Sequence, residues 1–204
     1  MNDSQDKNNS PFKFLVVGLG NPENSHAHNR HNVGFSALDA ISKVVVDQGI
    51  RFQPVFDGDL LKTTLKDSDS TFELFLFKPT TYMNNSGGPV AMLSRFYKIS
   101  PENTYVVHDD IDLKLGKIKV KCGGGHGGHN GLKSVDSYIS SRYSRIRIGV
   151  GRPEHKSQVA SYVLSNFTND EEIIMQHTYT KISVHLVLLL RREWPRFIEA
   201  CSLI

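Results

Sequence analysis

The chain has 204 residues, of which 39% are hydrophobic and 22% are charged, and this is the ordinary composition of one globular domain. Its formal net charge of +3 is compatible with an acidic partner such as RNA but does not by itself indicate one. The two cysteines, Cys122 and Cys201, exclude a disulfide framework and favour a reducing compartment, and the longest apolar run, at 182–190, is shorter than the ~20 residues that a membrane-spanning helix needs.

The N-terminal segment contains no apolar stretch and carries Asp3 and Asp6. This pattern is typical of neither a secretory signal nor an arginine-rich transit peptide. We therefore predict a disordered N-terminal tail at 1–12 and one domain at 13–204. We expect a cytoplasmic location, with the mitochondrion as the alternative.

The rest of the chain alternates between strand and helix patterns. Apolar runs that stop at glycine, proline or acidic residues predict buried strands at 12–22, 71–79 and 104–113. Alternating apolar and basic residues predict strands with one exposed face at 117–125 and 144–153. Apolar residues at helical spacing predict helices at 32–49, 87–100, 132–140 and 169–190, the last as one long helix. The segment 52–70 is interpreted as a hairpin on the edge of the sheet.

This order predicts an α/β fold: a single domain with a mixed, mostly parallel central sheet flanked by helices on both faces. In open α/β sheets, ligands bind beyond the carboxyl ends of the strands. Four loops at those ends carry polar, mostly uncharged groups: Asn21 and His31, then Tyr82, Met83 and Asn84, then His108, Asp109 and Asp110, and finally His126, His129 and Asn130.

Three kinds of site are compatible with these loops. The first is a dinucleotide site, because Gly18 and Gly20 follow a strand and Asp39 lies at a suitable distance, although Glu23 stands at the third glycine position. The second is a metal site built from Cys122, His126 and His129, completed by His108 and Asp109, although zinc ligands usually have a tighter and more regular spacing.

The third kind of site is a metal-free acid–base centre for hydrolysis. In it, His31 is the candidate base, an aspartate orients its ring, and asparagines donate hydrogen bonds to a carbonyl without adding charge. The chain has no Gly-x-Ser-x-Gly motif, so water is the expected nucleophile. The spacing of the residues alone does not choose among the three.

Four blocks resemble the successive signature motifs of the bacterial-type peptidyl-tRNA hydrolases: VVGLGNPENSHAHNRHNVG, KPTTYMNNSGGPV, VVHDDIDLKLGKIKVKCGGGHGGHNGLKS and RIRIGVGRP. The resemblance runs from about residue 14 to 153, in matching order and spacing, and the glycine-rich block is its most specific part. It implies an α/β enzyme without a cofactor or metal. Such an enzyme hydrolyses the ester between a peptide and the terminal ribose of tRNA, and recycles peptidyl-tRNA released from ribosomes.

The resemblance also assigns roles to individual residues. It implies that His31 is the general base on water and that Asp109 orients it, with Asp109 chosen over Asp110 by position. Three asparagines are implied to bind the peptide carbonyls, the ribose and the attacking water, namely Asn21, Asn84 and Asn130, and Asn21 is implied to distinguish an acylated amino group from a free one.

The remaining implied contacts concern the nucleic acid. Tyr82 and Met83 match a pair that lines the pocket at the substrate's end, and Lys121, Arg147 and Lys156 match positions assigned to tRNA phosphates. The resemblance thus implies peptidyl-tRNA as partner, and we expect a monomer without membrane attachment. His126 and His129 are expected to support the loop or contact RNA.

Two departures from the family pattern concern the first block. Glu23 replaces a glycine, and we expect it to point away from RNA, whereas His26 replaces a tyrosine and could still stack on a base or ribose. The C-terminal segment 186–204 is unusually apolar. It could cover the site, mediate association or end the fold.

Overall fold

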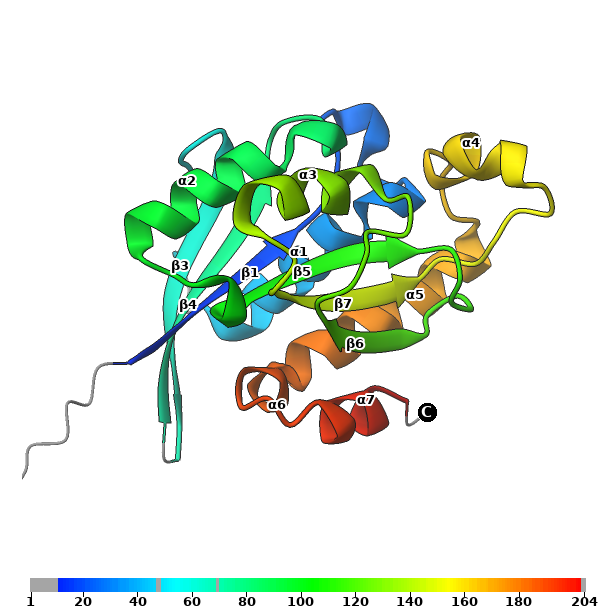
Figure 1. The fold of residues 1–204 in the computed structure, drawn as a ribbon. Helices are drawn as coiled ribbons and strands as arrows, with labels where there is room; N and C mark the ends of the chain where they lie inside the picture. Colours follow the sequence, from blue (N-terminus) through cyan, green and yellow to red (C-terminus); the bar gives the residue numbers. More distant parts are fainter. Residues whose placement is uncertain (1–10, 47–48, 69, 203–204) are drawn as a thin grey trace, which may run out of the picture.

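The computed structural model describes residues 11–46, 49–68 and 70–202, which form a seven-stranded sheet with helices on both faces (Figure 1). The strand order is β2-β3-β4-β1-β5-β7-β6. Nearly all of the predicted N-terminal tail lies outside the described residues, and the first strand begins at Phe12.

The sheet is parallel at its centre and antiparallel at both edges. The strands are β1 (Phe12–Gly18), β2 (Gln53–Pro54), β3 (Gly58–Asp67), β4 (Ser70–Pro79), β5 (Thr104–Asp110), β6 (Ile118–Cys122) and β7 (Ser144–Gly149). β1 pairs in parallel with β4 and β5, and β5 with β7. β3 and β6 add antiparallel strands to β4 and β7, and β2 pairs with β3 at the edge. The predicted mixed α/β sheet is therefore confirmed.

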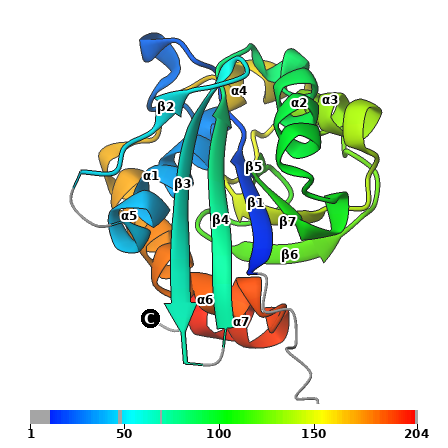
Figure 2. The same ribbon diagram turned by 90° about the vertical axis from the view of Figure 1, so that its left-hand side faces the viewer.

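Two hydrophobic cores lie on opposite faces of the sheet. On one face lie α1 (Val33–Val45) and α5 (Asn169–Val184), and on the other α2 (Gly87–Tyr97) and α3 (Asn130–Ile139), as Figure 2 shows. Successive side chains of a strand point to opposite faces, so Val16 joins the first core while Leu15 and Val17 join the second.

The prediction of one helix over 169–190 is wrong. α5 ends at Val184, and the chain continues through α6 (Leu186–Leu190) and α7 (Trp194–Ser202). The break at His185 redirects the apolar segment beneath the sheet, where the leucines of α6 and Phe197 of α7 are buried in the first core (Figure 1). This burial favours the break over a straight helix that would expose those leucines.

The apolar C-terminal segment therefore completes the core. The Trp194 indole donates to the Tyr105 hydroxyl at 3.2 Å, which ties α7 to the central strand β5. A short helix absent from the sequence prediction, α4 (Val159–Val163), precedes α5. Within the described ranges, no helix combines the length and the apolar character needed to cross a bilayer.

The topology places a crevice beside the end of β1. Its parallel neighbours β4 and β5 lie on opposite sides of it, and the connection after β1 leads to α1 on one face of the sheet, whereas the connection after β4 leads to α2 on the other face. Such a switch point is where open α/β sheets bind ligands. The loops after β1, β4 and β5 meet there.

Candidate active site

A buried carboxylate, Asp109, lies at the centre of the candidate site. It stands near the end of β5 and is 4% exposed. Nδ1 of His31, from the 3-10 turn η2 (Arg30–Asn32), lies 2.7 Å from Asp109 Oδ1. Nε2 of His129, which immediately precedes α3, lies 3.0 Å from the same oxygen. Segments 98 residues apart in the sequence thus converge on one oxygen atom.

The contact with Asp109 determines the chemistry of His31. Because a carboxylate only accepts hydrogen bonds, Nδ1 of His31 is the protonated nitrogen and Nε2 is left with a free lone pair. Burial lowers the pKa of His31, but the charge and hydrogen bond of Asp109 outweigh burial, so the pKa is raised above its ordinary 6.5. An imidazole held this way is a stronger base than a free one.

His129 caps α3 and also binds the carboxylate. Its Nδ1 accepts the backbone N–H groups of Gly131 at 3.1 Å and Leu132 at 3.3 Å, so its Nε2 carries the hydrogen donated to Asp109. Burial raises the pKa of Asp109, but the two histidines outweigh burial and hold it well below its ordinary value. Asp109 is therefore ionised throughout the physiological pH range.

Asn21 is held in one orientation by two neighbours. Its Oδ1 accepts the Met83 backbone N–H at 2.9 Å, which leaves the Nδ2 group as the available donor. Asn32, only 2% exposed, binds the backbone of Asn21 twice, through Asn21 N to Asn32 Oδ1 and Asn32 Nδ2 to Asn21 O, both at 2.9 Å. The side chain of Asn21 thus presents a neutral N–H donor at the end of β1.

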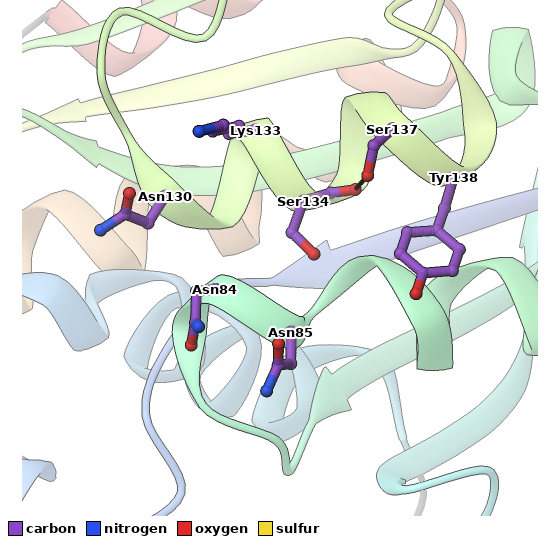
Figure 3. Close-up of a pocket in the computed structure, with 7 residues that line it drawn as sticks. All are labelled: Asn84, Asn85, Asn130, Lys133, Ser134, Ser137 and Tyr138. Atoms are coloured by element: carbon purple, nitrogen blue, oxygen red, sulfur yellow. Dashed lines mark hydrogen bonds between the residues drawn. The ribbon is translucent and has the colours of Figure 1, made fainter.

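Asn84 and Asn130 lie across a groove of about 390 Å³. Asn84 belongs to the turn η3 (Met83–Asn85), and Asn130 begins α3. Both side chains lie at the same end of the groove, whereas Tyr138 lies at the other end (Figure 3). Neither asparagine side chain bonds to another described residue, so both amides can bind a ligand.

The glycine-rich loop before α3 needs left-handed backbone and close approach. Gly124 and Gly128 have φ of +94° and +84°, which favours glycine. A Cβ at Gly131 would lie 2.5 Å from the Met83 sulfur and 2.9 Å from Leu19. Glycine at this position therefore lets α3 approach the loops that follow β1 and β4.

The predicted contacts around Tyr82 are divided between surface and core. Met83 is 5% exposed and packs in the second core, whereas Tyr82 is 55% exposed. The Tyr82 hydroxyl donates to the Glu23 carboxylate, so Glu23 is turned toward this aromatic residue. Nδ1 of His26 lies 2.6 Å from Asn29 Oδ1.

The predicted phosphate-binding residues differ in their surroundings. Lys121 is exposed on β6. Arg147 on β7 is half-buried and donates to Asp110 Oδ2 at 2.6 Å, so its charge is partly compensated. Lys119 lies directly opposite Arg147 in the ladder and shares its face. Lys156 is exposed in the turn η5 (Lys156–Gln158) ahead of α4.

The geometry does not favour a dinucleotide site. A Cβ at Gly18 would lie 2.4 Å from the Gly34 carbonyl oxygen, and one at Gly20 would contact the Phe35 ring. These glycines therefore allow α1 to pack closely on β1. Asp39 pairs with Lys78.

The metal set that was one of the three alternatives from the sequence is not assembled either. Cys122 Sγ donates to the Arg142 carbonyl, and His126 Nδ1 accepts the Gly128 N–H. Among the described residues, the group that could hold an ion is His31, Asp109 and His129. Its N–O distances of 2.7 and 3.0 Å are those of hydrogen bonds, shorter than the ~3.3 Å between two ligands of tetrahedral zinc.

Two residues of the site were not singled out in the sequence. Asn32, which holds Asn21, is adjacent to His31 in the first block and could have been weighed for that reason. Arg30 is buried, stacks on Tyr162 at 4.5 Å and Phe167 at 4.6 Å, and pairs with Glu171 at 2.7 Å. It fastens the segment containing α4 beside the His31 turn, and no local pattern reveals this contact.

Comparison with known proteins shows the family to which the chain belongs. The model of the peptidyl-tRNA hydrolase family matches residues 15–202. A peptidyl-tRNA hydrolase of Rickettsia bellii is 45% identical over 184 residues, which cover 90% of this chain and 97% of that protein. One from Sulfurimonas denitrificans is 49% identical over 159 residues, covering 78% and 80%.

Solved structures show the same likeness. The crystal structure of peptidyl-tRNA hydrolase from Acinetobacter baumannii superposes with a TM-score of 0.84 at 33% identity, covering 95% of this chain and 97% of that one. The Arg119Gln mutant of the same enzyme gives a TM-score of 0.85. The chain therefore belongs to the peptidyl-tRNA hydrolase family, and it is an ester hydrolase that acts on peptidyl-tRNA.

Proposed function

We propose that the chain hydrolyses the ester between an N-blocked aminoacyl or peptidyl group and the terminal ribose of tRNA by general-base catalysis without a metal ion. The observation that carries this proposal is the 2.7 Å contact between His31 Nδ1 and Asp109 Oδ1, which leaves His31 Nε2 as a base. The ring of His129, the residue before Asn130, lies 4.8 Å from the His31 ring. Recycling of peptidyl-tRNA released from ribosomes is the corresponding cellular role.

In the first step, His31 Nε2 removes a proton from water, and the resulting hydroxide attacks the ester carbonyl. Asp109 stabilises the imidazolium that forms and keeps its ring in place. The amide groups of Asn84 and Asn130 are available to donate to the carbonyl oxygen as it gains charge. Collapse of the tetrahedral intermediate then breaks the bond to the ribose oxygen, which takes the proton from His31.

Asn21 supports selection of blocked substrates. Its fixed Nδ2 group can donate to a peptide carbonyl, but it offers no countercharge to the ammonium group of aminoacyl-tRNA. Sparing aminoacyl-tRNA matters physically, because its hydrolysis would waste the aminoacylation reaction. The electrostatic neutrality of Asn21 is thus part of the proposed specificity.

The basic face formed by Lys119, Lys121 and Arg147 is proposed to hold tRNA phosphates. Phosphate contacts provide affinity that does not depend on base sequence, which suits an enzyme that accepts many tRNAs. The partial pairing of Arg147 with Asp110 orients its guanidinium group. Lys156 is proposed as a further contact from the segment ahead of α4.

The test is release of N-acetylated amino acid from charged tRNA, with free aminoacyl-tRNA as the control and with and without a chelator. We expect turnover of the blocked substrate, at an unchanged rate with the chelator. Loss of turnover with the chelator, restored by added zinc, would replace this mechanism by one that uses the His31, Asp109 and His129 group as ligands. RNA binding without turnover would indicate a binding protein.

A further inference from the structure

A second hollow of about 380 Å³ adjoins the groove that contains Asn84 and Asn130. The first hollow lies between η3 and α3, and the second lies between the C-terminal parts of α2 and α3. Tyr138 lines both, and its ring extends from α3 toward α2 (Figure 3). The two hollows therefore adjoin at Tyr138 and are together called the channel, which runs along α3 away from His129 and the proposed position of the ester.

The charged side chains that line this channel are all positive. Lys133 lines the first hollow, Arg95 and Lys98 line the second, and neither hollow is lined by Asp or Glu. None of the three cations forms an ion pair with a described residue, whereas Arg145 and Arg147 are both paired. Three cations gathered along one lining that contains no acidic side chain favour an anionic ligand.

The length of the channel can be judged along α3. Asn130 and Tyr138 are eight residues apart, which corresponds to about 12 Å at 1.5 Å per residue. A stacked nucleic-acid strand rises about 3.4 Å per nucleotide, so this length fits about three or four nucleotides. Tyr138, which is 55% exposed, lies where a base could stack.

We propose that this channel holds the unpaired 3′ end of the tRNA, with a base stacked on Tyr138 and phosphates beside Lys133, Arg95 and Lys98. The proposal rests on the proposed function, since it assumes that the ester lies at His31. Aromatic side chains together with cations along a groove are the usual way in which proteins bind single strands.

The alternative occupant is the peptide, because the substrate has two arms at the ester. Peptides released from ribosomes differ in charge, so a lining of three cations would disfavour many of them. The 3′ strand has the same backbone charge in every tRNA. A uniformly cationic channel therefore suits the RNA arm.

The experiment compares KM for three substrates with the same N-acetylated amino acid: the ester of adenosine, the ester of a short single strand ending in CCA, and the full tRNA. The variants are Tyr138→Ala, Tyr138→Phe, Arg95→Ala and Lys98→Ala. The matched control is Lys43→Ala, since Lys43 is also exposed and without an ion pair to the described residues, but lies on α1 at the opposite face of the sheet.

We expect Tyr138→Ala to raise KM about 5- to 100-fold for the single strand and for the full tRNA, the range measured for loss of one base–aromatic stack. KM for the adenosine ester should not change. Tyr138→Phe keeps the aromatic ring and should have the wild-type KM for all three substrates. Arg95→Ala and Lys98→Ala should each reduce the log–log salt slope of KM for the single strand by about 0.7. Lys43→Ala should leave all three values unchanged.

Two results would overturn the proposal. If the variants raised KM for the adenosine ester as much as for the longer substrates, these residues would belong to the catalytic pocket or support the fold. An increase in KM that becomes larger when the peptide on one tRNA is lengthened would assign the channel to the peptide. Failure of the wild type to hydrolyse any of the three esters would instead contradict the proposed function, so the two failures are distinguishable.

Discussion

His129 and His31 share a single oxygen atom of Asp109, at 3.0 and 2.7 Å, and their ring centroids lie 4.8 Å apart. His129 therefore has two roles, because it also accepts the first backbone N–H groups of α3. The same side chain connects the start of that helix to the proposed base. This connection explains why the glycine-rich loop must close so near the end of β5.

His129→Ala and His129→Asn should separate these two roles. The alanine variant loses the cap of α3 and should reduce the free energy of unfolding by about 1 kcal/mol, within a usual range of 0.5–2. Asparagine is also a good N-cap, so His129→Asn should keep most of this stability. Both variants remove a donor from Asp109, so both should lower kcat. Denaturant unfolding and kinetics check this prediction, and wild-type kcat in His129→Asn would restrict His129 to capping.

His31→Ala should lower kcat by about 10²–10⁴-fold, the usual contribution of a general base. Binding of tRNA should remain nearly unchanged, because affinity depends mostly on phosphate contacts. Single-turnover hydrolysis and a separate tRNA-binding titration measure the two effects. A variant with near-normal kcat would show that another group activates the water.

Asp109→Asn should lower kcat less than His31→Ala does and should shift the acidic limb of the pH–rate profile to lower pH. The pKa of His31 is raised by Asp109, so in the wild type the base form accumulates only as the pH rises above the ordinary 6.5. Removing the carboxylate lowers this pKa. Because the pKa of His31 is higher in the folded than in the unfolded protein, the ion pair with Asp109 stabilises the fold at pH values below the unfolded pKa. This contribution is lost as the pH rises through the folded pKa.

The measurement is kcat as a function of pH in both proteins, with Asp110→Asn as the matched control. Asp110 is the adjacent carboxylate, but it pairs with Arg147. The control should therefore leave the acidic limb in place. A shifted limb in Asp110→Asn together with an unshifted one in Asp109→Asn would exchange the roles of the two acids.

Asn21→Asp is nearly isosteric and should reduce the preference for blocked substrates. The aspartate keeps an oxygen to accept the Met83 N–H but loses the Nδ2 donor and adds a negative charge. That charge attracts the ammonium group of aminoacyl-tRNA. The ratio of kcat/KM for acetylated and free aminoacyl-tRNA should fall, and equal reductions of both values would assign Asn21 to general geometry.

Lys121→Ala and Arg147→Ala should raise KM for the full tRNA with little change in kcat, because phosphate contacts contribute equally in the ground and transition states. Each should reduce the salt slope of KM by about 0.7–0.9. Arg147→Ala should have the larger effect, since it leaves Asp110 without its partner near the RNA. The adenosine ester should be unaffected by both, and equal losses on it would place these residues in the catalytic pocket.

Local patterns in the sequence determined the strands, most helices and the candidate residues at the strand ends. The alternation of Ile118 and Val120 with lysines, for example, indicates one buried and one exposed face, and β6 has this arrangement. The site itself required the resemblance to a family, because isolated histidines and asparagines are common in turns. The prediction of one helix over 169–190 was wrong because helical spacing does not reveal where a chain must turn to bury its leucines.

Only the tertiary structure decided which atoms meet. Three interactions join segments whose approach depends on strand order and on the backbone of the loops. They are the hydrogen bond from His129 to Asp109, the hydrogen bonds between Asn32 and the Asn21 backbone, and the hydrogen bond from Tyr82 to Glu23. These contacts form because parallel strands bring distant loops to one edge, and because a glycine such as Gly131 lets helices come within van der Waals distance. A linear sequence carries the residue types for this chemistry, but the chosen tautomers and orientations arise from packing.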